Sequence, residues 1–169
     1  GLYDAGESIQ NLKLVTSLKK PIGFFDPDNP EGRGIKREVK DDKKEEKVRT
    51  IEEISRSLRW PILSFASTDM AFRDNILVAG SYHGFNIYEI QTDGIPNLIS
   101  SVVCPGGQGD VSVVGNILIM SVEETRGRVD CGLDGVGPDA SPERFRGIRI
   151  FDISNIKKPK QVGAVQTLS

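Results

Sequence analysis

The stretch Cys-Pro-Gly-Gly-Gln-Gly-Asp-Val-Ser-Val-Val-Gly-Asn-Ile-Leu-Ile-Met, residues 104–120, decides the fold class. A glycine-rich turn leads into two short apolar runs, and Gly115-Asn116 separates these runs. Short apolar runs bounded by turn residues are typical of β-strands. The glycines could also suggest a phosphate-binding loop, but the GxGxxG spacing is lacking and no helix is expected to follow. We therefore interpret 104–120 as a junction between two structural repeats.

A similar pattern occurs earlier in the chain. The run Asn-Ile-Leu-Val at 75–78 corresponds to Asn-Ile-Leu-Ile at 116–119, so the residue numbers differ by an offset of 41 (116 − 75). Further on, Gly-Phe-Asn-Ile-Tyr-Glu-Ile at 84–90 corresponds to Gly-Ile-Arg-Ile-Phe-Asp-Ile at 147–153, an offset of 63 (147 − 84). The difference between the two offsets predicts an inserted loop in the second copy, at 121–146.

Each copy is expected to contain four short antiparallel strands, and a period of about 40 residues with four strands is typical of a β-propeller blade. We therefore predict an all-β chain with one blade at 60–104 and a second at 105–169. The segment 1–29 is expected to supply a strand, at 11–17, to another blade, because this run resembles the fourth strand of a repeat. A propeller has typically 4–8 blades. The ring is therefore expected to be incomplete, with the missing blades coming from a larger protein or another chain.

The region 30–59 is predicted to be a charged linker with a short helix. Nearly every residue from 36 to 49 is charged, and the signs are mixed, so this run cannot bury an apolar face. Thr50 and Glu53 have capping-box spacing, which predicts a helix at 51–58. The charged run could dock the protein as a peripheral subunit of a membrane assembly, although such runs are most often simply solvated.

Composition excludes several classes of function. The chain has 169 residues, of which 37% are hydrophobic and 27% charged, as expected for a protein with a packed core. The net charge of −2 gives no strong attraction to nucleic acid. No apolar run reaches the length of a transmembrane helix. The first residues lack the features of a signal peptide, so either there was none or the chain is the mature form.

Two cysteines, Cys104 and Cys131, lie outside any CxxC spacing. They fit either one disulfide in an oxidising compartment or two buried free thiols, and the residues alone leave both open. A catalytic thiol is not expected, because the only histidine, His83, lies in a predicted turn away from both cysteines. One histidine is also too few for a metal site with a second histidine, so no catalytic or metal-ligating residue is assigned.

Charged residues in the predicted insertion are the best binding candidates, because propellers place binding loops at such positions. These candidates are Glu123, Glu124, Arg126, Arg128 and Asp130. The alternative is internal pairing, with Arg126 or Arg128 held by Glu123 or Glu124. A Ca²⁺ site formed by Asp110, Glu123, Glu124 and Asp130 is a further alternative, but no EF-hand spacing supports it, and no cofactor is predicted.

Four strings resemble the LVIVD-repeat proteins, which are bacterial and archaeal β-propellers. They are Gly-Phe-Asn-Ile-Tyr-Glu-Ile (84–90), Val-Cys-Pro-Gly-Gly-Gln-Gly-Asp-Val-Ser-Val (103–113), Met-Ser-Val-Glu-Glu-Thr-Arg-Gly-Arg (120–128) and Arg-Phe-Arg-Gly-Ile-Arg-Ile-Phe-Asp-Ile-Ser (144–154). The resemblance implies an exported protein with no established enzymatic activity. It thereby favours the disulfide and a periplasmic, cell-surface or secreted location.

The chain departs from the family in two ways. Members of the family are much longer, and they continue after the equivalent of Val165-Gln166-Thr167 with a cysteine and a histidine-rich turn, where this chain has Leu168-Ser169. We expect a non-enzymatic propeller module that mediates protein–protein interaction. The alternative is part of an enzyme or metal-binding protein whose site lies at the propeller axis.

Overall fold

The computed structural model describes residues 6–25, 67–124, 127–133, 135–136 and 140–167. The predicted charged linker at 30–59, with its short helix, lies outside these ranges. Within them the chain forms eight β-strands and no helix, and accordingly no helix in the described part could span a membrane.

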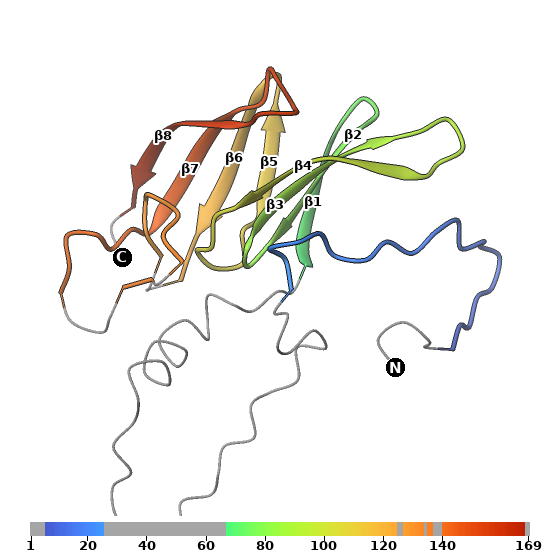
Figure 1. The fold of residues 1–169 in the computed structure, drawn as a ribbon, viewed down its shortest axis with the longest axis horizontal. Coiled ribbons are helices and arrows are strands. Elements are labelled where there is room, and N and C mark those ends of the chain that lie inside the picture. Colours follow the sequence, from blue (N-terminus) through green and yellow to red (C-terminus); the bar gives the residue numbers. More distant parts are fainter. Residues whose placement is uncertain (1–5, 26–66, 125–126, 134, 137–139, 168–169) are drawn as a thin grey trace, which may run out of the picture.

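The strands form two four-stranded antiparallel sheets, and in each sheet neighbouring strands follow one another in the sequence (Figure 1). The first sheet consists of β1 (Ser67–Arg73), β2 (Ile76–Ser81), β3 (Gly84–Ile90) and β4 (Pro96–Val103). The second consists of β5 (Val111–Val114), β6 (Ile117–Val122), β7 (Gly147–Asp152) and β8 (Lys160–Gln166). The expected all-β chain with two sets of four antiparallel strands is confirmed.

The hydrophobic core lies between the two sheets. Alternate side chains of a strand point to opposite faces, and Phe85 and Ile87 of β3 belong to the same buried cluster as Leu118 and Met120 of β6. Phe85 and Phe151 pack edge to face across the two sheets, with ring centroids 4.9 Å apart. Burying each large apolar side chain contributes roughly 1.5–3 kcal/mol. This shared layer therefore holds the sheets face to face.

The two sheets pair their strands in the same register. Met70 of β1 lies opposite Ala79 of β2, and at the equivalent positions of the second sheet Val111 of β5 lies opposite Met120 of β6. The second and third strands agree as well, because Ala79 pairs with Asn86 and Met120 pairs with Arg149. A slip of one residue would turn every side chain to the other face. The shared register therefore means that equivalent positions point in equivalent directions.

Local irregularities recur at the same positions of both sheets. The register shifts after Ile87 in the first sheet and after Ile150 in the second, which is again the offset of 63 (150 − 87). Gly84 and Gly147 differ by the same offset and both have positive φ, +131° and +149°. A Cβ at either glycine would collide with a carbonyl of the fourth strand. The two sheets are therefore copies of one structural unit, bulge included.

The strand expected at 11–17 is not formed. Residues 6–25 follow an irregular path beside the first sheet (Figure 1), with Val15 lying near the β3–β4 turn at Gly94. An extended segment becomes a strand only where another strand pairs with its N–H and C=O groups, and no described strand pairs with this one. The apolar side chains of 11–17 remain exposed; Leu12, for example, is 83% exposed.

Candidate functional site

The segment 104–110 connects β4 to β5 and crosses from the first sheet to the second. Its first residue, Cys104, is fully buried and donates its N–H to the carbonyl of His83 at 2.9 Å. Gly107 has φ +121°, and a Cβ there would lie 2.7 Å from the backbone nitrogen of Glu124. Glycine is therefore required by the close approach of two backbones. This supports the interpretation of the glycine run as a crossover between repeats.

A disulfide joins this crossover to the insertion between β6 and β7. Cys104 and Cys131 are bonded, with their Cα atoms 4.4 Å apart and a sequence separation of 27. Closing a loop of this length stabilises the folded state by about 3–4 kcal/mol if the gain comes from restricting the unfolded chain. The bond fixes the insertion to the junction of the two sheets, and it is compatible with an oxidising, extracytoplasmic environment.

Arg149 of β7 lies beneath the same junction and is fully buried. Its guanidinium donates to the carbonyl oxygens of Cys104 at 3.1 Å and Pro105 at 3.0 Å, and to that of Arg128 in the insertion. Burial lowers the pKa of Arg149 to about 10, and the charge of Asp130 opposes this shift. The side chain therefore stays charged at neutral pH and binds the crossover and the insertion together through their carbonyls.

Arg128 forms the centre of a charged cluster on the insertion. It makes two bonds to Asp130, of 2.8 and 2.7 Å, and an ion pair of 2.5 Å with Glu143. The side-chain hydrogen bond from Arg128 holds the pKa of Asp130 far below its usual range, and the bond to Asp130 raises the pKa of Arg128. Internal pairing of the insertion therefore exists, but the partners of Arg128 are Asp130 and Glu143 instead of the predicted Glu123 or Glu124.

Two other binding candidates, Glu123 and Glu124, contact the crossover. Glu123 accepts hydrogen bonds from the hydroxyl of Ser121 at 2.7 Å and from the backbone N–H of Gln108 at 3.3 Å, so it secures the crossover. Glu124 donates its backbone N–H to the carbonyl of Gly106 at 2.9 Å. Arg126 lies outside the described residues. The described candidates thus make several contacts with the crossover and within the insertion.

Carboxylates at the start of β1 and β5 come close enough to influence one another. Burial, followed by the charges of Glu123 and Asp69, raises the pKa of Asp110. Asp69 already accepts hydrogen bonds from the backbone N–H groups of Met70 and Val111. Among the described residues, no group of three His, Cys, Asp or Glu side chains is arranged to hold a metal ion. The calcium alternative therefore receives no support from this part of the chain.

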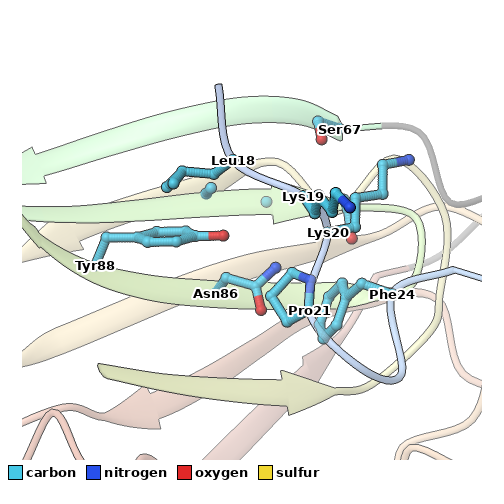
Figure 2. A pocket seen from close by; sticks show the side chains of 11 residues that line it. Leu18, Lys19, Lys20, Pro21, Phe24, Ser67, Asn86 and Tyr88 are labelled. Atoms are coloured by element: carbon cyan, nitrogen blue, oxygen red, sulfur yellow. The ribbon is translucent and has the colours of Figure 1, made fainter. Parts of the chain in front are cut away.

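A cavity of about 110 Å³ lies between the N-terminal segment and the outer face of the first sheet (Figure 2). Pro21 and Phe24 cover it from one side, while Asn86 and Tyr88 of β3 line the sheet side. Asn86 is 6% exposed, and its Oδ1 has no hydrogen-bond partner among the described residues. Burial raises the pKa of Tyr88. The cavity is small and partly polar, as expected of a site that holds water.

The sequence analysis did not identify three polar residues of this region. Arg149 and Asn86 were treated only as members of strands, although a polar residue in an otherwise apolar β-run is a signal for a buried hydrogen-bond network. Glu143 was missed because it lies 15 residues from Arg128, and only the folded insertion brings the two together.

A scan against protein-family models and searches of curated proteins and of solved structures found no match to this chain.

Proposed function

We propose that this chain is a section of a β-propeller of the LVIVD-repeat type, acting outside the cytoplasm as a non-enzymatic module that binds other proteins. One observation carries the proposal. Two four-stranded meanders share register, bulge position and positive-φ glycines at constant offsets, and they stack face to face. Sequential four-stranded sheets that recur in this way are the building unit of propellers.

The apolar side chains exposed on the outer faces of the two sheets support the same proposal. The outer face of the first sheet exposes Met70 and Phe72, and that of the second exposes Val114, Ile117 and Val165. An isolated two-sheet sandwich would be expected to carry polar side chains on its outer faces. Apolar side chains on both outer faces are instead expected when each sheet packs between two neighbouring sheets.

The junction between the sheets supports a structural role outside the cytoplasm. The disulfide between Cys104 and Cys131, the buried Arg149 and the Arg128–Asp130–Glu143 cluster all connect parts of the same chain. Disulfides persist in oxidising compartments and are rare in the cytosol. The insertion, held rigidly by these contacts, would present a fixed surface to a partner protein.

The native mass and shape of the protein test this proposal. We expect the protein purified from an oxidising compartment to be a particle larger than its 18.5 kDa chain, and electron microscopy to show a ring of sheets around an axis. A stable, fully folded monomer of 18.5 kDa in the native preparation would contradict it. A ring with a metal or small molecule bound at its axis would instead favour an enzyme or metal-binding protein.

A further inference from the structure

We propose that the two outer sheet faces are complementary to each other and that a second copy of this chain docks between them, head to tail. This inference rests on the proposed propeller-type stacking and goes beyond it by naming the occupant. It depends on the matching register of the two sheets. We call residues at equivalent positions of the two sheets counterparts, and a residue on an outer face has its counterpart in the buried core.

The outer face of the first sheet repeats the inner face of the second. Met70 is the counterpart of Val111, which is 4% exposed, whereas Met70 is 61% exposed. Tyr88 in the same way is the counterpart of Phe151, whose ring packs against Phe85. We call this surface the head face and define it by Met70, Phe72, Leu77, Ala79 and Tyr88. In the second sheet, the counterparts of these residues lie on the inner face, which packs against the first sheet.

The outer face of the second sheet repeats the inner face of the first. Four isoleucines, which we call the tail face, take the positions of four residues that are buried in the first sheet. Ile117, Ile119, Ile148 and Ile150 stand at the positions of Ile76, Val78, Phe85 and Ile87. All four of the buried counterparts are at most 7% exposed. The tail face is therefore the surface onto which a further sheet would dock in this arrangement.

Close contacts in the existing interface also have equivalents on the tail face. A Cβ placed on Gly80 would lie 2.2 Å from the carbonyl oxygen of Gly109 and 3.2 Å from Cγ1 of Val111, so the crossover requires a glycine there and Val111 packs against it. The position equivalent to Gly80 in the second sheet is Ser121, at the same offset of 41 (121 − 80), and serine is also small. Ser121 has a Cβ and a hydroxyl where Gly80 has neither, so Met70 of a second copy would meet a shallower site than the one that Val111 occupies.

The N-terminal segment lies over one part of the head face, because Leu18 lines the cavity together with Ala79 and Tyr88. A second copy would pack beside this segment, which lies near the position of the equivalent crossover in the second sheet. Pro21 lines the cavity beside Asn86 on the first sheet, just as Pro105 contacts Arg149, the counterpart of Asn86, on the second. Contacts between unlike faces are heterologous, and they close into a ring when the rotation between sheets permits. The two described sheets are fewer than the typical 4–8 of a ring, so further sheets docked head to tail would complete it.

Two single substitutions test the direction of docking. Met70→Asp places a charge on the head face and Ile119→Asp on the tail face. We expect the wild-type chain to form particles of at least twice 18.5 kDa in analytical ultracentrifugation, and each variant alone to sediment as a monomer. Mixed in equal amounts, the variants should form a dimer and nothing larger, because only one intact head and one intact tail remain. This recovery would also show that both variants fold.

Val129→Asp serves as the matched control, because Val129 is an exposed apolar residue of the insertion and belongs to neither face. It should assemble like the wild type. Val114→Asp, at the more exposed rim of the second sheet's outer face, replaces Ile119→Asp if that variant does not fold.

A wild-type chain that stays monomeric at high concentration overturns the inference, as does a dimer that persists in each variant alone. A chain that is monomeric by itself but lies in a ring with a different protein in the native preparation would contradict the second copy and leave the proposed function standing.

Discussion

At the scale of single residues, Arg149 is the clearest case of a side chain whose role is set by its surroundings. A buried charge without partners is strongly destabilising, whereas a guanidinium that donates to several carbonyls is tolerated. Arg149 occupies the position that Asn86 occupies in the first sheet, and both point toward the segment that enters their sheet. The arginine reaches three carbonyls of that junction, so it couples the two sheets and the insertion.

Removal of this guanidinium should therefore be costly. In Arg149→Met the carbonyls of Cys104, Pro105 and Arg128 lose their donor inside the protein, and we expect the free energy of unfolding to fall by about 3 kcal/mol or more. Chemical denaturation measures this loss. Arg73→Met is the matched control, because the Arg73 side chain makes its hydrogen bonds at the exposed β5–β6 turn and its removal should cost about 1 kcal/mol or less. Equal losses in the two variants would refute the role given to Arg149.

His83 predicts a pH dependence of stability. Burial lowers its pKa below the ordinary value, although the bond to the Gly23 carbonyl opposes this shift. The folded state therefore resists protonation, while the unfolded chain takes up a proton as the pH falls through about 6.5. Stability should decrease from about pH 7 toward pH 5.

The chain has only one histidine, so the comparison with His83→Gln is direct. The variant should lose the part of the slope between about pH 7 and pH 5 that comes from the imidazole. Chemical denaturation at a series of pH values gives both curves. Parallel curves for the wild type and the variant would show that His83 is not the titrating group.

At the scale of elements, the disulfide decides how firmly the insertion is attached. In Cys104→Ala combined with Cys131→Ala, we expect a loss of about 2–4 kcal/mol in the free energy of unfolding. Reduction of the wild-type protein should lower its stability by a similar amount, and it should have no effect on the double variant. If the reduced and oxidised proteins unfold at the same denaturant concentration, the bond does not stabilise the fold.

Most strands could be predicted from the sequence because their apolar residues alternate or form short runs between turn residues. The strand Gly84–Ile90 coincides with the run at 84–90, and the strand Gly147–Asp152 falls within the corresponding run at 147–153. The run 11–17 has the same kind of pattern but forms no strand, because pairing requires a neighbouring strand that a local pattern does not reveal. The partners of Arg128 could not be predicted either, because their contacts depend on how the insertion folds back on itself.

At the scale of the whole molecule, the repeat determines more than the number of strands. The two offsets between the repeats, read from sequence, agree with the observed register of both sheets. With these offsets, an exposed residue on the outer face of one sheet can be matched to the buried residue at the equivalent position of the other sheet. One sheet by itself would not allow this comparison. The insertion has no equivalent in the first repeat, so its binding candidates could not be compared in this way. Several of these residues make contacts within the chain.

The long insertion between β6 and β7 also has a consequence for the order in which the sheets fold. β2 and β3 are joined by 82–83 alone, whereas the whole segment 123–146 separates β6 from β7. Closing the longer connection costs about 2 kcal/mol more in chain entropy. The first sheet should therefore form early from local hairpins, and its completed face would then serve as a template on which the slower second sheet assembles.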